Sequence, residues 1–301
     1  MLLFLDAASL WYRSYHAVPS SVTAPDGRRS GALRGFFDGI STLWHRFSPT
    51  GLVCCLEGNW RPQWRVDLVN SYKAQRTAED GSEDSPEGLD EQVAAIEQLL
   101  AAWGLATAAH PEYEADDVLA TLAVRANDDV AIATGDRDLF QLVDDHYGIS
   151  VIYMGGGLAK AKRFDEAAVM EKYGIPPSLY RDFAVLRGDA SDGLPGVTGI
   201  GDKGAATLLH RFGDLATLQA AAHDSDSSLT ARQRTGLVAA EEYLPAAAAV
   251  STAVKNVDIP EVDPAVPSQP IQPVAVRALI EQWGIGNVTD RCADTLGIAR
   301  P

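Results

Sequence analysis

The segment Leu2-Leu3-Phe4-Leu5-Asp6 is a short apolar run that ends in an acid, and the same pattern occurs twice more. Residues 52–56 form a second run, which Glu57 follows directly, and residues 130–133 form a third, which leads through a Thr-Gly pair to Asp136. Continuous apolar runs of this length are typical of parallel strands buried on both faces. The sequence therefore predicts a sheet of buried parallel strands with an acid at the end of each.

Helical patterns separate these runs. Residues 89–103 and 116–125 have apolar positions at helical spacing, so strands alternate with helices. This alternation predicts an α/β fold with a mostly parallel central sheet flanked by helices. The second half of the chain is predicted to be mainly helical, from Asp165 onward and at 178–187, 203–212, 215–222 and 229–249.

Two segments have neither pattern. Residues 72–88 are polar, and the acidic stretch 78–85 within them has the composition of a loop. Residues 257–273 contain prolines at positions 260, 264, 267, 270 and 273, which prevent a regular helix. We expect an extended strap there, followed by a last short helix from Val274.

The acids at the strand ends are the first candidate site. Asp6, Glu57 and Asp136 should meet at one edge of the sheet, where open parallel sheets bind their ligands. Further acids lie on elements that can border this edge: Glu114, Asp116, Asp117, Asp138, Asp189 and Asp192. Nine carboxylates in one place repel one another unless cations neutralise them, and such oxygen ligands suit Mg²⁺ or Mn²⁺. A two-metal site for phosphoryl-transfer chemistry is the simplest interpretation.

Each acid taken alone also has a structural explanation. Asp6 precedes a helical pattern and could be its N-cap, and residues 114–117 open a helix, where acids favour the positive end of the dipole. Aspartates in glycine-flanked turns, as at 136–138 and 189–192, are common for their own hydrogen bonds. The conjunction of all nine carries the metal-site hypothesis.

Several other residues are candidates for contacts with nucleic-acid phosphates. The glycine-rich segment 193–203 precedes a helix, so its backbone N–H groups and the helix N-terminus could hold a phosphate, although such loops are often plain interhelical turns. Lys73 and Arg76 could place cations against a scissile phosphate while Tyr72 stacks on a base, although exposed basic residues usually form a solvated face. Arg13 is a candidate for a terminal phosphate, and Arg65 is a second one.

Composition narrows the function classes. The chain has 301 residues and a formal net charge of −16, which argues against a protein that coats nucleic acid through its overall charge. It has no apolar run of bilayer length and no basic N-terminal segment before its apolar start, so membrane spanning and secretion are disfavoured. The three cysteines cannot all pair, and they fit a reducing, cytoplasmic compartment.

At this point the sequence resembles the flap endonuclease or 5′ nuclease family, and most closely the 5′-exonuclease domain of bacterial DNA polymerase I and its stand-alone relatives. The similarity runs in family order over about residues 1–250. It is carried by Asp6–His16, Gly31–Phe36, Tyr72–Arg76, Glu114–Ala123, Thr134–Val143 and Gly188–Ala205.

The resemblance implies a resolvase-like or PIN-like core at 1–185 with a helical arch or clamp at about 70–90. It further implies a helix-hairpin-helix (H2TH-type) DNA-binding region at 186–256, often with a K⁺ ion, and leaves 257–301 as the strap and a helix packing on the core. Asp6, Glu57, Glu114 and Asp116 look like a first metal cluster, and Asp136, Asp138, Asp189 and Asp192 like a second, with Asp117 adjacent. Lys73 and Arg76 match the basic residues at the arch base. The hairpin residues are Gly196, Gly199, Gly201 and Lys203.

Two positions depart from the family pattern. Glu57 stands where the bacterial family usually has Asp. Its longer side chain alters the expected geometry of the first metal site, so the occupancy of that site, or a preference for Mn²⁺, is an open question. Pro86-Glu87 comes ten residues after Arg76, beyond an acidic insertion, whereas the family has this Pro-acid pair within a few residues. The arch is therefore expected to be longer and to repel backbone phosphates.

The sequence thus predicts a free-standing, divalent-metal-dependent 5′ nuclease that cuts flap, nicked or gapped DNA duplexes at single-strand to double-strand junctions. It is expected to act as a monomer alongside a DNA polymerase and a ligase in replication and repair. One alternative is a noncatalytic junction-binding protein with an impaired metal site. Another is an RNA-cutting nuclease of the PIN type, which would not need the hairpin.

Overall fold

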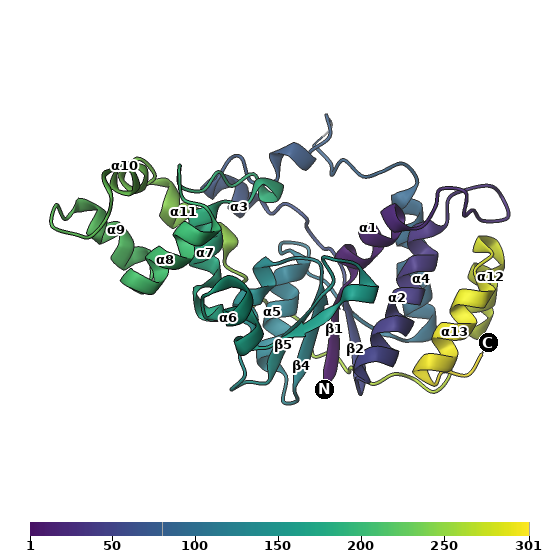
Figure 1. Cartoon of the computed structure of the whole chain (residues 1–301). Helices are drawn as coiled ribbons and strands as arrows, with labels where there is room; N and C mark the ends of the chain where they lie inside the picture. Colours follow the sequence, from purple (N-terminus) through teal and green to yellow (C-terminus); the bar gives the residue numbers. More distant parts are fainter. Residues whose placement is uncertain (80, 301) are drawn as a thin grey trace.

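The computed structural model describes residues 1–79 and 81–300, and its centre is a six-stranded sheet (Figure 1). The strand order is β3-β2-β1-β4-β5-β6, and every neighbouring pair is parallel except β5 and β6. The strands are β1 (Leu2–Asp6), β2 (Gly51–Cys55), β3 (Ala106–Ala108), β4 (Val130–Thr134), β5 (Ile149–Tyr153) and β6 (Lys162–Phe164). The expected mostly parallel sheet flanked by helices is confirmed.

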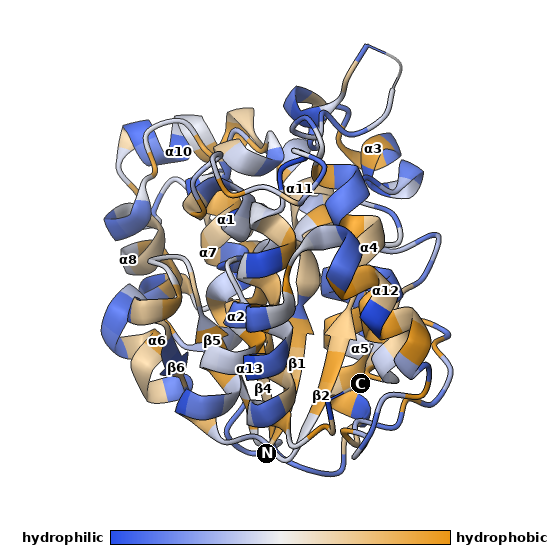
Figure 2. Ribbon diagram, turned by 90° about the vertical axis from the view of Figure 1, so that its right-hand side faces the viewer, coloured by the Kyte–Doolittle hydropathy of each residue, from blue (hydrophilic) through white to orange (hydrophobic). Residues whose placement is uncertain are grey.

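The strand β1 lies at the centre, between β2 and β4. Leu2 pairs with Gly51 on one side and with Val130 on the other, so the three strands start and end together. Their apolar character is visible in Figure 2, where β1 and β2 are largely hydrophobic. Their carboxyl ends therefore lie side by side at one edge of the sheet.

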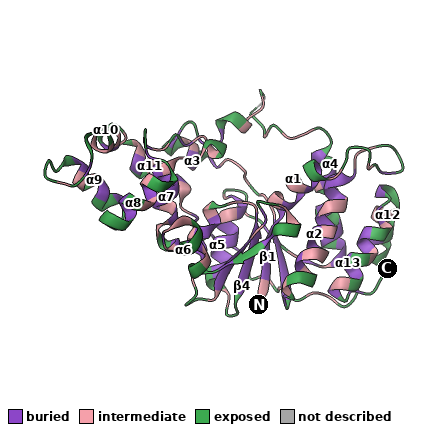
Figure 3. Cartoon of the chain, viewed as in Figure 1, coloured by how far each residue is buried: buried purple, intermediate pink, exposed green. Residues whose placement is uncertain are grey.

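Helices cover both faces of the sheet. The first half of the chain contributes α1 (Ala7–Ala17), α2 (Gly31–Phe47), α3 (Gln63–Leu68), α4 (Leu89–Trp103) and α5 (Ala115–Arg125). Alternate residues of β1 enter different cores: Leu3 and Leu5 pack with α2 and α4, whereas Phe4 packs with α5. This period of two is what a strand buried on both faces requires. Figure 3 shows the resulting buried layer.

The second half is mainly helical, as expected. Its helices are α6 (Glu166–Tyr173), α7 (Tyr180–Arg187), α8 (Asp202–Phe212), α9 (Leu215–His223), α10 (Ala231–Ala239), α11 (Tyr243–Ser251), α12 (Pro273–Trp283) and α13 (Gly286–Leu296). Residues 257–272 contain no helix or strand, which agrees with the expected proline strap.

Two expectations about helices were wrong. The single helix predicted at 229–249 is two helices, α10 and α11, because Pro245 has no N–H group and would clash inside a continuous helix. Pro245 instead lies in the first turn of α11, where backbone N–H groups have no partner within the helix, so the missing N–H costs no hydrogen bond. The single short helix predicted after the strap is the hairpin α12–α13, which turns at Gly284 with a φ of 60°.

The segment between Arg76 and Leu89 differs from the expected helical arch. Its described residues contain no helix after the short 3-10 turn η1 (Ala74–Arg76), and Thr77 bridges Glu83 in an antiparallel pair. Asp80, within the predicted acidic loop, lies outside the described residues. This segment has no apolar positions at helical spacing, so nothing would hold a helix against the core. Figure 1 shows it crossing above the carboxyl edge of the sheet to α4.

Candidate active site

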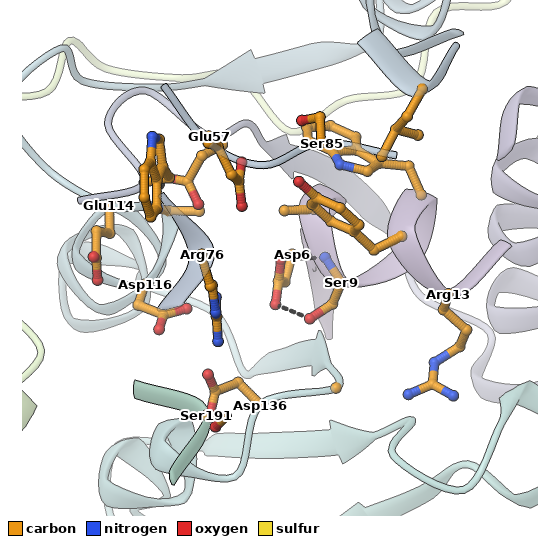
Figure 4. A pocket seen from close by; sticks show the side chains of 18 of the residues that line it. Asp6, Ser9, Arg13, Glu57, Arg76, Ser85, Glu114, Asp116, Asp136 and Ser191 are labelled. Atoms are coloured by element: carbon orange, nitrogen blue, oxygen red, sulfur yellow. Dashed lines mark hydrogen bonds between the residues drawn. The ribbon is translucent and has the colours of Figure 1, made fainter. Parts of the chain in front are cut away.

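A cavity of about 1220 Å³ opens at the carboxyl edge of the sheet, beneath the segment that crosses above it. Many of the predicted site residues line it: Asp6, Glu57, Glu114, Asp116, Asp136 and Asp189 among the acids, and Arg13, Lys73 and Arg76 among the cations. In Figure 4, Asp6, Glu57, Asp116 and Asp136 surround the space into which Arg76 reaches.

Asp6 has both roles that the sequence offered for it: it caps a helix and it lines the cavity. Its carboxylate caps α1 by accepting the N–H of Ser9 at 2.9 Å. It also accepts the hydroxyls of Ser9 at 2.5 Å and Thr134 at 2.6 Å. These bonds, one from a backbone N–H and two from hydroxyls, fix the direction of the carboxylate at the end of β1.

Glu57 lies two residues beyond β2 and is held by the N–H of Ala115, at 3.1 Å. Burial raises the pKa of Glu57 to about 7, with Glu114 and Asp6 acting in the same direction and Lys73 opposing them. A carboxyl group in this environment is costly to ionise unless a cation comes close. Glu57 lines the cavity, so its side chain, longer than that of Asp, still brings a carboxylate oxygen there.

Glu114 is the N-cap residue directly before α5, and hydrogen-bond donors already surround its carboxylate. Arg65 forms a buried ion pair with it, the Tyr72 hydroxyl donates at 2.9 Å, and the Lys73 Nζ donates at 2.9 Å. Tyr72 is only 3% exposed. The prediction that Tyr72 stacks on a base is therefore wrong, because its ring is buried and its hydroxyl is bound to Glu114.

Asp117 is an exception among the predicted metal ligands. It is fully buried and does not line the cavity. One oxygen accepts the Nη2 of Arg65 at 2.7 Å and the N–H of Val254 at 2.8 Å, and the other accepts the N–H of Glu114 at 3.2 Å. The structure thus gives Asp117 a capping and ion-pairing role at the start of α5 and contradicts its assignment as a ligand.

The second group of acids gathers around the turn after β4. The N–H of Asp138 donates to Asp136 at 2.8 Å, and Asp192 accepts Arg76 at 3.1 Å. Burial, together with Asp192, raises the pKa of Asp136 to about 6. Burial, together with Asp136, Asp192 and Asp189, raises the pKa of Asp138 well above its usual range. Asp138 and Asp192 belong to this group electrostatically, although they do not line the cavity.

The donor chemistry fits divalent cations. One buried oxygen of Asp138, Oδ1, has no hydrogen-bond partner, and burial with Asp136, Asp6 and Glu114 raises the pKa of Asp116 well above its usual range. Oxygen donors that repel one another in this way are suited to Mg²⁺ or Mn²⁺. Within residues 1–79 and 81–300, however, no three His, Cys, Asp or Glu side chains converge tightly enough to form a ready ligand shell.

The cations predicted to bind phosphate differ in how far they are buried and in the partners that they already have. Lys73 is buried, has a φ of 49° and bonds to Glu114 and to the Trp60 carbonyl at 3.1 Å. Arg76 is partly exposed and paired with Asp192. Arg13 lines the cavity, and its Nε is buried without a hydrogen-bond partner. Among these three cations, Arg13 is therefore the one that no carboxylate of the described residues pairs with.

The glycine-rich segment turns the chain between α7 and α8. Gly196 has a φ of 68°, and a Cβ there would lie 2.5 Å from the backbone nitrogen of Gly188. Gly199 has a φ of 84° and packs against Arg232. Gly201 precedes α8 and faces open space, and Lys203 is exposed in the first turn of that helix. Gly196 and Gly199 thus serve internal packing, whereas Gly201 and Lys203 remain open to a ligand.

This contrast gives a paired prediction. Gly196→Ala is expected to destabilise the protein by about 2 kcal/mol or more, because it adds both a strained φ and a backbone clash. Gly201→Ala should leave the melting temperature unchanged, because its φ of −106° suits alanine and nothing lies within 4 Å. Thermal denaturation of the two variants checks this, and equal melting temperatures would contradict the packing role of Gly196.

Sequence reasoning missed the residues that hold the site together. Arg65, considered only as a phosphate contact, instead binds Glu114 and Asp117 in the interior. Thr134 could have been noticed, because it ends an apolar run directly before Gly135-Asp136. Nothing in the local pattern around Arg65 indicates burial, since the pairing depends on the packing of α3 near α5.

The fold and site can now be compared with known proteins. A family model described as the N-terminal, resolvase-like domain of 5′-3′ exonucleases matches residues 1–174, and one for the C-terminal SAM fold matches residues 175–272. A 5′-3′ exonuclease of Streptomyces coelicolor is 46% identical over 98% of this chain and 99% of its own length. A Mycobacterium bovis DNA polymerase I is 36% identical over 72% of this chain, which corresponds to 24% of the polymerase.

Solved structures show the same fold. The bacteriophage T5 D15 protein co-crystallised with metal ions superposes with a TM-score of 0.65, at 18% identity, over 99% of both chains. A substituted form of the same flap endonuclease, in a pseudo-enzyme-product complex with DNA and metal ions, gives a TM-score of 0.64 at 17% identity over 98% of this chain and 97% of its own. With both family models matching in order, and a relative nearly half identical along its full length, the chain belongs to the 5′-3′ exonuclease family.

Proposed function

We propose that this 5′-3′ exonuclease also acts as a flap endonuclease that hydrolyses DNA phosphodiesters at single-strand to double-strand junctions, with two divalent ions. The observation that carries the proposal is the cavity at the sheet edge, where carboxylates from four segments surround Arg76 and which Arg13 also lines. The named T5 relative, which is a flap endonuclease bound to DNA and metal ions in one structure, supports the same activity.

The residues that line the cavity are proposed to have two roles, metal binding and phosphate binding. Asp6, Glu57 and Asp116 would provide oxygens for a first ion, and the group around Asp136 would provide them for a second. Glu114 would join only if Arg65, Tyr72 or Lys73 freed one of its oxygens. When bound, Mg²⁺ or Mn²⁺ supplies an activated water and neutralises the charge of the leaving oxygen. Arg76 and Arg13 lie where they can hold phosphate oxygens.

The Lys73–Glu114 pair holds the Lys73 ammonium close to the cavity. In the structure its Nζ is 2.9 Å from Glu114, and burial opposes its charge while Glu114 raises its pKa. A phosphate that enters the cavity offers this ammonium a second anionic partner. Lys73 is therefore proposed to stabilise the charge that develops on the scissile phosphate.

Cleavage assays test the proposed function. A 5′-labelled flap duplex, a blunt duplex and a flap of RNA are incubated with EDTA, Mg²⁺ or Mn²⁺, and the products are sized. The expected result is metal-dependent cleavage at the flap junction of the DNA. Tight binding to flap DNA without cleavage under any condition would instead support a noncatalytic junction-binding protein.

Metal binding should also change the pH dependence of stability. The raised pKa values of Asp136, about 6, and Glu57, about 7, mean that the folded protein without metal holds these protons more tightly than the unfolded chain. The stability they contribute is full in acid and is lost as the pH rises through these values. Because metal ions bind the deprotonated forms, the stabilisation by Mg²⁺ or Mn²⁺ should be larger at about pH 8 than at about pH 5.5.

Differential scanning fluorimetry at the two pH values, with EDTA or Mg²⁺, measures this effect. In EDTA the melting temperature is expected to be lower in the alkaline sample than in the acidic one. The control variant is Asp128→Asn, in which an exposed acid at the opposite end of β4 loses its charge. It should show the same Mg²⁺ effect as the wild type at each pH. An equal Mg²⁺ effect at both pH values would contradict the protonation of the cavity acids.

The remaining assignments follow from the same proposal. The protein is proposed to be a cytoplasmic monomer that works with a DNA polymerase and a ligase, with 1–185 as nuclease core, 186–256 as DNA-binding region and 257–301 as strap and closing helices. A K⁺ ion at the turn before α8 is proposed from the open position of Gly201. No helix in the described part of the chain is long and apolar enough to span a membrane.

A further inference from the structure

A second cavity, of about 670 Å³, is lined by residues of β5, α6, α7 and α8. Its charged lining consists of Arg137, Lys172, Lys203 and a single acid, Asp202. This excess of positive charge is notable in a chain with a net charge of −16. The cavity is therefore a local basic site in an acidic protein.

The two lysines of this cavity have no acidic partners. Within the described residues, neither Lys172 nor Lys203 forms an ion pair, and Asp202 is 68% exposed and is 4.0 Å from Arg187. Arg137 is paired only loosely, at 3.8 Å from Asp189. Cations that gather without a matching carboxylate repel one another, so an anion between them lowers the free energy.

Lys172 is held in position by aromatic rings. Its Nζ lies 4.9 Å from the ring centre of Tyr153, 5.0 Å from that of Phe164 and 5.1 Å from that of Tyr173. Rings at these distances attract an ammonium group and restrict a side chain that is usually mobile. Burial, with Arg137 and Lys162 nearby, lowers the pKa of Lys172, as expected for an ammonium without a counter-ion.

The second cavity adjoins the catalytic cavity. Arg137 and Tyr153 line both of them, so they form the wall that the two cavities share. Arg137 also lies between Asp136 and Asp138 in the sequence and lines the catalytic cavity, so it brings a positive charge to the wall of that cavity. A nucleic-acid backbone that extended from the catalytic cavity across this wall would reach the cavity that Lys172 and Lys203 line.

We propose that Lys172 and Lys203, with Arg137, form a phosphate subsite that grips the backbone of the substrate duplex next to the catalytic cavity. The inference rests on the proposed function, because it takes the DNA substrate from it. The subsite binds phosphate oxygens and reads no base. It gives an acidic protein a local hold on DNA and sets how far along the duplex the scissile bond lies.

The salt dependence of DNA binding tests the subsite. Lys172→Gln, Lys203→Gln and the double variant are titrated with flap duplex in EDTA at several salt concentrations. Each lost phosphate contact is expected to reduce the slope of log Kd against log salt by about 0.9. Arg277→Gln, which removes one exposed positive charge on α12, outside both cavities and outside residues 186–256, is the control and should leave the slope unchanged.

A second measurement locates the contact. Phosphates of the duplex are replaced one at a time by uncharged methylphosphonates, and the binding of each substrate is measured. The wild-type protein should lose affinity at one or two positions to which the double variant is insensitive. In Mg²⁺ the double variant should have a raised KM and an unchanged kcat, because the subsite holds the duplex and does not touch the reacting bond.

The outcomes separate this inference from the proposed function. If the wild type cuts flap DNA and the double variant keeps the wild-type slope and methylphosphonate pattern, the subsite is overturned and the nuclease assignment stands. If the wild type does not cut DNA, the proposed function fails, and the slopes still decide whether the lysines bind DNA. Weaker binding of inorganic phosphate by the variants, with DNA binding unchanged, would assign the cavity to a free anion and overturn the proposal.

Discussion

The Asp136→Asn variant is expected to lose roughly 10²–10³-fold in the rate of flap cleavage, which is the size of effect seen when one preorganised electrostatic group is removed. The asparagine keeps the shape of the side chain and can still accept the N–H of Asp138, so the turn after β4 should persist. It removes the charge that a divalent ion requires. Single-turnover cleavage of a 5′-flap duplex in saturating Mg²⁺ measures the loss.

The same variant should be more stable than the wild type when metal is absent. Ionised Asp136 is disfavoured by burial and by Asp192, so a neutral amide relieves repulsion above about pH 6. In EDTA at neutral pH, the melting temperature should rise, whereas the gain on adding Mg²⁺ should shrink. Asp128→Asn, at the other end of β4, should cut like the wild type. Full metal-dependent cleavage by Asp136→Asn would show that the second acidic group is assigned wrongly.

Replacing Arg65 by methionine should be among the most destabilising substitutions in the chain, at about 3–5 kcal/mol, because two buried carboxylates would lose their common partner. The Arg65 side chain is 3% exposed, and those of Glu114 and Asp117 are 4% and 0% exposed. A lysine at this position cannot serve both acids, since it lacks the fork of the guanidinium. Arg65→Lys should therefore restore part of the stability and leave Glu114 poorly placed.

Arg291 provides the matched control for this prediction. It forms an ion pair of 2.6 Å with Asp38, but both side chains are about half exposed. Pairs at the surface contribute about 0–1 kcal/mol, so Arg291→Met should change the melting temperature little. Chemical denaturation of the three variants gives the comparison. Similar losses for Arg65→Met and Arg291→Met would show that the Arg65 network does not stabilise the fold.

The strand-end acids could be placed from the sequence because strand geometry fixes them. A buried parallel run followed by an acid puts a carboxylate at the sheet edge whichever helices surround it, and Asp6 and Asp136 are there. The short edge strands β3 and β6 could not be predicted, since three residues each carry too weak a pattern. Their pairing depends on neighbours that are distant in sequence.

Side-chain roles within a motif were harder to predict. Tyr72 and Asp117 belong to segments that resemble the family, yet both turn inward, because Arg65 draws Asp117 and Glu114 while Glu114 binds the Tyr72 hydroxyl. Such a network is decided by the packing of α3 and the turn after it near α5. The sequence pattern reports which residues are present near the site, and it does not report which of them face one another.

The last helix of the chain completes the packing around the second. α13 contacts α2, and Val288, Cys292 and Leu296 share one apolar core with Phe36 and Phe37. On the ribosome, residues 31–47 are made roughly 10–50 s before residues 286–296, at ordinary rates of translation. One side of α2 therefore stays uncovered until α13 has been made. The yield of folded protein in a cell should consequently depend on chaperones that bind this early segment until the final helix has been synthesised.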